Sequence, residues 1–440
     1  MRLPKVFTGT LVGLALAAAS SAPAQAATSC DRVASPSGSD SGAGTLESPY
    51  LTASKLAGSL APGETGCFRA GTYSFGTLTL TTAQVTLAPY GSEAVTLAGH
   101  IKALPAAQNS VIEGMVLDAS SSPDNTMGPK IYASGFVLRD NEITNRHSEI
   151  CVIVGSYNSE PAPVGVVIER NRIHDCGALP ATNLDHGIYI AEARSTIVHD
   201  NWIYDNADRG IQQYPDVKGS VITGNVIASN GQGVNFSGAG SLVTTDATVA
   251  GNIVVDSKIG DNAYSGGSGP NGTNNLFRDN CVHSLSGGSG IESSPRSFTA
   301  SNNLVANPDF VAAAADDYRL EASSACLAKY TGTMSGIGSP PPTPKLGRVK
   351  LAVNRRSVRR GRQFRLRGNV PVGLESSHRR VVIERRDGGE WRRAAGTPVR
   401  SDQRFSASVS ASDSPVLKLR AVVAGAAHSR VVRVRARVRG

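Results

Sequence analysis

Outside its first 26 residues, the 440-residue chain has no apolar run approaching the ~18 residues that a membrane-spanning helix needs. It also has no Cys-x-x-Cys pair and no mixed histidine–cysteine cluster, the spacings typical of a zinc site. Stretches with helical periodicity are scarce as well. These absences argue against a membrane span, a structural metal site and a largely helical fold. We expect an all-β protein without an obligatory cofactor.

The N-terminal segment, residues 1–26, has the features of a secretory signal peptide. Arg2 and Lys5 precede an apolar run from Val6 to Ala19, and Ala24-Gln25-Ala26 forms a small-x-small cleavage site. The apolar part is too short to cross a bilayer. We therefore expect a secreted, extracellular protein.

Six cysteines follow the cleavage site, and an even number in an exported chain indicates disulfides. We expect nearest-neighbour pairing, because each bond would then join adjacent layers of the repeat described below. The expected pairs are Cys30 with Cys67, Cys151 with Cys176, and Cys281 with Cys326.

The net charge of +9 hides two parts of opposite sign. Residues 345–440 hold 25 Lys and Arg against 6 Asp and Glu, a net of 25 − 6 = +19, and the remainder carries 9 − 19 = −10. This asymmetry predicts two domains with different partners. The Gly/Ser/Pro-rich stretch 331–345 is typical of an extended linker between a first domain at 27–330 and a second at 346–440.

Asparagine recurs in the first domain every 23 to 30 residues within one frame of flanking apolar residues. The positions are Asn141, Asn171, Asn201, Asn225, Asn252, Asn280 and Asn303. Short β-branched strands at this period predict a right-handed parallel β-helix, in which each asparagine bonds to its counterparts above and below. A short helix at 51–60, with Leu51, Leu56, Ala57 and Leu60 on one face, would cap the first coil.

Residues 35–73, "SPSGSDSGAGTLESPYLTASKLAGSLAPGETGCFRAGTY", resemble the opening of secreted right-handed parallel β-helix proteins of the pectate-lyase-like superfamily. The "NxI…GI" coils resemble the generic repeat of that superfamily. The resemblance covers about residues 30–330. It implies the fold, and it implies one of several activities, since relatives include polysaccharide lyases, epimerases, hydrolases and proteins without known catalysis.

Asp185-His186-Gly187-Ile188 returns 23 positions later as Asp208-Arg209-Gly210-Ile211. With the isoleucines facing inward, the next residue of each strand faces outward, so successive coils form a polar ladder. We expect the ladder to bind substrate through Gln212, Asn235, Glu292, Asp185 and Asp208, beside His186, Arg209 and Tyr189. Trp202 and Tyr204 lie in the same coil.

This set of residues fits removal of the α-proton of a uronate, the acidic sugar of acidic polysaccharides. His186 would be the base, Arg209 and Gln212 would neutralise the carboxylate, and Tyr189 would supply a proton. Elimination or C5 epimerisation would follow, and the need for Ca²⁺ stays open. The stretch is similar to the histidine coil of β-helical alginate epimerases. The coil 147–158 lacks the lysine of chondroitinase-B-type lyases.

Two other functions use the same surface. A glycoside hydrolase would employ carboxylates, with Asp185, Asp208 and Glu292 as candidates. A non-catalytic protein would bind a glycan or the cell wall through the ladder without a base.

The second domain alternates apolar and basic residues, as in "SRVVRVRARVRG", which predicts a small β-sandwich resembling bacterial immunoglobulin-like domains. Its charge should attract an anionic cell-wall polymer or acidic polysaccharide and give a cell-wall-associated protein. No nucleic-acid recognition motif occurs in it. We expect a monomer.

Overall fold

The computed structural model describes residues 29–333, except 121–127, 159 and 268, and much of residues 350–437. Within the second range it leaves out 355–356, 370–379, 388–389, 399, 401–403, 412–413, 415, 424–426 and 429–430. The expected signal peptide and most of the expected linker lie outside the described residues. No helix in the described part is long and apolar enough to cross a membrane.

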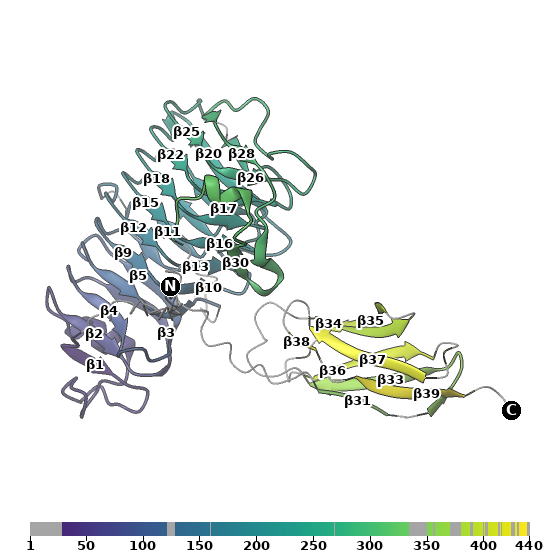
Figure 1. The fold of residues 1–440 in the computed structure, drawn as a ribbon. Coiled ribbons are helices and arrows are strands. Elements are labelled where there is room, and N and C mark those ends of the chain that lie inside the picture. Colours follow the sequence, from purple (N-terminus) through teal and green to yellow (C-terminus); the bar gives the residue numbers. More distant parts are fainter. Residues whose placement is uncertain are drawn as a thin grey trace, which may run out of the picture.

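Residues 32–305 coil into a parallel β-helix whose short strands form three stacks (Figure 1). The first stack contains β1 (Arg32–Ala34), β2 (Thr65–Phe68), β4 (Thr86–Pro89), β6 (Val111–Glu113), β9 (Val137–Arg139), β12 (Val167–Glu169), β15 (Ile197–His199), β18 (Val221–Thr223), β22 (Thr248–Ala250), β25 (Leu276–Arg278) and β27 (Thr299–Ser301). The expected fold class is therefore confirmed for this part of the chain.

The other two stacks share long N-terminal strands that bend from one face to the next, β3 (Gly71–Leu80) and β5 (Val95–Ala103). The second stack continues with β7 (Val116–Asp118), β10 (Glu142–Thr144), β13 (Arg172–His174), β16 (Trp202–Tyr204), β19 (Val226–Ala228), β23 (Ile253–Val255), β26 (Cys281–His283) and β28 (Leu304–Val305). The third stack contains β8 (Lys130–Ile131), β11 (Val152–Val154), β14 (Ile188–Ile190), β17 (Arg209–Gln213), β20 (Gln232–Ala239) and β24 (Ala263–Gly267), with β21 (Leu242–Val243) in a hairpin on β20.

Helix α1 (Ala53–Ser59) packs against the first coil, as expected for a cap. Thr52 is its N-cap, and the Thr52 hydroxyl accepts a hydrogen bond from the Lys55 amide. Leu56, Ala57 and Leu60 are buried, but Leu51 is exposed. Leu51 differs from the expectation because it precedes the N-cap and so lies outside the helical face.

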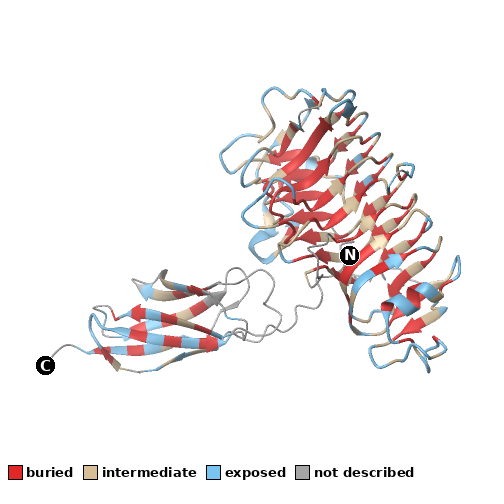
Figure 2. Ribbon diagram, turned by 180° about the vertical axis from the view of Figure 1, so that it is seen from behind, coloured by how far each residue is buried: buried red, intermediate tan, exposed pale blue. Residues whose placement is uncertain are grey.

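The interior is a continuous column of aliphatic side chains, and Figure 2 shows the buried positions running from coil to coil. A row of asparagines borders this core. From Asn141 to Asn280, the backbone N–H and side-chain N–H₂ of each asparagine donate to the side-chain oxygen of the next. Asn303 accepts the last of these bonds, so the predicted scaffold role of the row is confirmed.

A second, shorter amide row was not anticipated. The Cys176 amide donates to the Asn206 side chain, and Asn206 donates in turn to the Asn230 side chain. A Cβ atom on Gly187 would lie 2.8 Å from Asn206 Nδ2, and one on Gly210 would lie 2.9 Å from Asn230 Nδ2. The glycine of the Asp-x-Gly-Ile repeat is therefore required by the close approach of this row.

After β28 the chain returns over the outer face of the second stack through β29 (Phe310–Ala312), a 3₁₀ turn at Ala313–Ala315, β30 (Asp317–Leu320) and a second 3₁₀ turn at Ala325–Ala328. Tyr318 packs on Trp202 and Tyr204 there. The disulfide Cys281–Cys326 ties this segment to β26. All six cysteines pair as expected, with Cys30–Cys67 and Cys151–Cys176 as the other two bonds.

The second domain has two sheets. One contains β31 (Lys350–Val353), β33 (Gln363–Asn369) and β36 (Arg404–Ser410), and the other contains β32 (Ser357–Arg359), β39 (Val432–Arg437), β37 (Val416–Val423), β34 (Arg380–Asp387), β35 (Glu390–Pro398) and β38 (Ala427–His428). Side chains of both sheets, including Phe364, Phe405, Ile383 and Leu419, form one buried core. This shared core is the defining property of a β-sandwich.

Replacing Asn201 by alanine should lower the free energy of unfolding by about 3 kcal/mol. Asn201 is fully buried, and its loss removes the side-chain oxygen that accepts from the Asn171 amide and the side-chain amide that donates to the Ile168 carbonyl. Urea unfolding followed by circular dichroism measures the change. Asn307→Ala is the matched control, because the exposed Asn307 side chain accepts a single bond from the Asp309 amide. Equal losses in the two variants would contradict the scaffold role.

Candidate active site on the third strand stack

The outward residues of the third stack form one column in the register of the strands. Tyr189 lies opposite Gln212, Gln212 opposite Asn235, and Asn235 opposite Tyr264. Glu292 extends the column, because the preceding residue Ile291 bridges to Ala263. Adjacent strands are ~4.8 Å apart, so these side chains are neighbours although up to 103 positions separate Tyr189 from Glu292 in the sequence.

Arg209, at the start of β17, is a buried cation with neutral partners. Its guanidinium donates to the Tyr264 hydroxyl through Nε, to the Asn183 carbonyl at 3.0 Å, and to the Asn183 side-chain oxygen. It forms no ion pair within the described residues and is 7% exposed. The two oxygens of Asn183 meet the two terminal nitrogens as a carboxylate would, but without the charge.

His186 and Gln212 each have a buried polar atom that lacks a hydrogen-bond partner. His186 Nδ1 and Gln212 Oε1 are both buried and have no hydrogen bond to the described residues. Burial and the nearby charge of Arg209 lower the pKa of His186 to about 3, so its imidazole is neutral at physiological pH. The ring lies edge-on to Tyr189, with 5.6 Å between centroids. Burial raises the pKa of Tyr189 to about 12, which keeps its hydroxyl protonated.

The three acidic residues expected at the site bond to the backbone. Asp185 accepts from the Ala178 amide at 3.1 Å, and Asp208 accepts from the Asp185 amide at 2.9 Å. Both are buried, and both also accept from the Thr182 hydroxyl. Glu292 accepts from the Ser265 amide at 2.7 Å. Asp185 and Asp208 thus hold the loop 177–185, whose Asn183 covers Arg209. Within the described residues, no group of three or more His, Cys, Asp and Glu side chains is arranged to hold a metal ion.

Several residues of the site were not anticipated from the sequence. Tyr264 lies on a coil between those of Asn235 and Glu292 and has no Gly-Ile signature. Lys130 and Lys102 continue the column on the other side, because Tyr189 pairs with Ile153, Ile153 with Lys130, and Lys130 with Lys102. The coil 147–158 indeed lacks a lysine, but the preceding coil supplies one. Burial and the neighbouring Lys102 lower the pKa of Lys130.

Glu149 was also missed. Burial and the adjacent Asp185 carboxylate, with which it shares a hydrogen bond, raise the pKa of Glu149. It precedes β11 by a few residues and comes from a stretch with no repeat signature. Only the pairing of coils shows that these two carboxyl groups are neighbours.

Trp202 and Tyr204, although they come from the same coil, do not belong to this site. They lie on β16 in the second stack and are buried under the C-terminal return. Tyr204 stacks on His174, whose centroid is 4.9 Å away. Burial acts to lower the pKa of His174, but bonds to Asp175 and Glu142 raise it to about 9. His174 is thus paired with Asp175 and Glu142 beneath the C-terminal return. We interpret this arrangement as structural.

His186 predicts a pH dependence of stability. Its folded-state pKa of about 3 is below the unfolded value of about 6.5, so the unfolded chain binds the extra proton between these values. The stabilising contribution is complete above pH 6.5 and decreases on acidification, by at most about 1.4 kcal/mol per pH unit. Relative to His186→Gln, the wild type should lose about 2 kcal/mol of unfolding free energy between pH 7 and pH 5.

Urea titrations at both pH values measure this difference. In Arg209→Gln, the decrease should be smaller, because the charge of Arg209 contributes to the low pKa. Parallel pH profiles for the wild type and His186→Gln would show that His186 is not held neutral in the folded protein.

The chain is similar to one protein family and to several solved structures. Among solved structures, the chain is similar to "Rhamnogalacturonan lyase" (15% identity, TM-score 0.39, 66% of this chain and 95% of that chain). It is also similar to "The complex structure of XylC with xylose" (11%, TM-score 0.41, 92% and 100%) and "Crystal structure of Agl-KA catalytic domain" (12%, TM-score 0.33, 56% and 61%). No curated protein matches. Residues 108–275 match the family described as "Right handed beta helix region", and with its three stacks of parallel strands the first domain is a right-handed parallel β-helix.

Proposed function

We propose that this protein is a secreted carbohydrate-active enzyme that removes the α-proton of a uronate in an acidic polysaccharide, leading to elimination or C5 epimerisation. The observation that carries the proposal is the environment of Arg209. A buried guanidinium with only neutral partners has given up hydration without gaining a counter-charge. A ligand carboxylate taking the place of the Asn183 oxygens would supply that charge in the same bidentate geometry.

His186 is suited to accept the proton. It is neutral, and Nδ1 lacks a partner in the described structure. Burial keeps its basicity low, and the uncompensated positive charge of Arg209 opposes protonation further. Binding of a substrate carboxylate to Arg209 would remove that opposition and raise the pKa of His186. The base would therefore become stronger when the substrate is in place.

The two outcomes differ in the fate of the electron pair left at C5. The Arg209 charge stabilises the enolate of the carboxylate in both. In elimination, a C4–C5 double bond forms as the C4–O bond breaks, and Tyr189 protonates the leaving oxygen. In epimerisation, Tyr189 returns a proton to the opposite face of C5. Gln212 Oε1, buried without a partner, would accept a hydrogen bond from a sugar hydroxyl.

A panel of uronate polymers tests the proposal with three assays. Elimination gives short-wavelength ultraviolet absorbance from the unsaturated product, and epimerisation in D₂O gives exchange at C5 without cleavage. Hydrolysis gives reducing ends alone. His186→Ala and Arg209→Gln should each lower the rate by at least ~10²-fold through loss of the base or of enolate stabilisation.

His199→Ala is the matched control, since His199 lies in the first stack and pairs with Glu169 and Asp200. Its rate should equal that of the wild type. Full activity in His186→Ala would place the base elsewhere. A wild type that binds the polymers but is silent in all three assays would indicate a non-catalytic glycan-binding protein.

One observation favours a glycoside hydrolase as a second candidate. Glu149 lies beside Asp185, and its pKa is raised by burial and by that carboxylate, as is required of a general acid. Release of reducing ends without absorbance, abolished by Glu149→Gln but retained in His186→Ala, would support it over proton abstraction. The opposite pattern would exclude Glu149 as the acid.

A further inference from the structure

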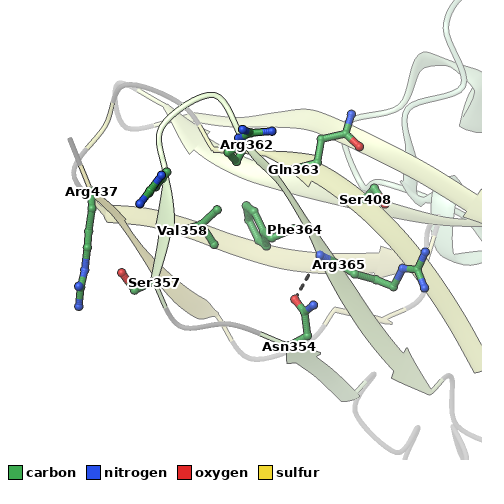
Figure 3. A pocket seen from close by; sticks show the side chains of 10 residues that line it. Asn354, Ser357, Val358, Arg362, Gln363, Phe364, Arg365, Ser408 and Arg437 are labelled. Carbon is green, nitrogen blue, oxygen red and sulfur yellow. Dashed lines mark hydrogen bonds between the residues drawn. The ribbon is translucent and has the colours of Figure 1, made fainter. Parts of the chain in front are cut away.

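The second domain contains a pocket of about 860 Å³ with cationic walls. It lies between β32, β33 and the end of β39, and Figure 3 shows Arg362, Arg365 and Arg437 around it. Arg359 also lines the pocket, and none of its lining residues is acidic. Val358 and Phe364 attach this wall to the buried core of the sandwich. Arg359, Arg365 and Arg437 lie on strands of the sandwich, and Arg362 lies in the turn between β32 and β33.

The strand register forces two of these charges together. β32 and β39 are parallel, and Arg359 lies directly opposite Arg437. Both project away from the core, because the neighbouring pair Val358 and Ala436 is buried. Like charges directly opposite one another on adjacent strands destabilise a sheet.

A contrasting pair occurs in the same sheet. Arg420 lies opposite Glu384, and its Nε donates to the Glu384 carboxylate at 2.7 Å. The sheet therefore compensates a cation where a carboxylate is opposite, whereas no ion pair joins Arg359, Arg362, Arg365 or Arg437 to any carboxylate that the structure describes. An anion from outside the chain would offset the repulsion between Arg359 and Arg437.

We propose that this arginine pocket is a binding site for a linear acidic polysaccharide, separate from the site on the β-helix. Guanidinium groups bind carboxylates in a bidentate manner. Gln363 and Ser408 add amide and hydroxyl groups to the same wall, which match the hydroxyls of a sugar chain. Ser357 Oγ at the pocket is buried and has no partner within the described residues.

The lining favours a polysaccharide over a nucleic acid. Proteins that bind single-stranded nucleic acid stack the bases on exposed aromatic rings. Phe364 is the aromatic residue of this pocket, and it is buried in the core with 4% exposure. A mixture of cations and neutral hydrogen-bonding groups without a stacking surface fits a carboxylated sugar polymer.

Binding of the full-length protein to immobilised polygalacturonate tests the site. The double variant Arg359→Gln/Arg437→Gln should bind at least ~10-fold more weakly than its parent, because two charge-assisted contacts are lost. All measurements use an Arg209→Gln background, which keeps the β-helix site from contributing. The affinity of the parent should decrease with added salt, since exposed charges are screened over ~8 Å at physiological ionic strength.

The control is Arg278→Gln/Arg319→Gln, which removes the same net charge from two exposed ion pairs of the first domain, with Asp279 and Asp317. It should bind within 2-fold of the parent, as a ~2-fold change corresponds to less than 1 kcal/mol. Circular dichroism verifies that each variant is folded. Equal weakening in the two double variants would show that binding depends on net charge and not on a specific site. Tighter binding to single-stranded DNA or polyphosphate than to polygalacturonate would overturn the assignment to a polysaccharide.

Discussion

The hydrogen bonds between successive coils support everything else in the first domain, and the buried asparagine row is their most demanding part. Most strands of the helix have only three residues, too few to be stable alone. Each becomes stable because its backbone groups bond to the coil above and below. At the turn after the first stack, the backbone cannot complete this pattern, and the asparagine side chain supplies the missing donors and acceptor.

This stacking also explains how a site arises from distant residues. Coils in register place equivalent positions ~4.8 Å apart, so a side chain has the same neighbour above and below whatever the loop lengths. The Arg209 side chain reaches Tyr264, which is in register with Gln212 two coils earlier, and Asn183 contacts Arg209 from the loop of the preceding coil. Strand β17, which carries Arg209, pairs with β14 and β20, so the backbone that supports Arg209 is rigid.

The two domains differ in whether their uncompensated positive charges are buried or exposed. In the β-helix, one guanidinium is buried against neutral oxygens and lowers the pKa of the adjacent histidine. In the sandwich, several arginines remain exposed around a pocket, where water and salt moderate their repulsion. The first arrangement suits one well-placed carboxylate, and the second suits repeated weak contacts along a polymer.

The sequence by itself determined the periodic features. The asparagine frame and the β-branched flanks specify the coils, and Cys30–Cys67 and Cys151–Cys176 follow because neighbouring coils bring these cysteines together. Cys281–Cys326 instead joins β26 to the C-terminal return. The column Tyr189, Gln212 and Asn235 could also be predicted, since the Gly-Ile signature sets its register.

The site residues that the sequence repeat does not predict could be identified only from the tertiary structure. Tyr264, Lys130 and Glu149 come from coils without the signature. Trp202 directly follows Asn201 and therefore lies in the second stack, where the C-terminal return covers it. The burial of Arg209 depends on the loop 177–185, whose path is set by side-chain bonds to Asp185 and Asp208. A local pattern records which residues face inward, but contacts between coils depend on loop geometry, which has no periodic signal.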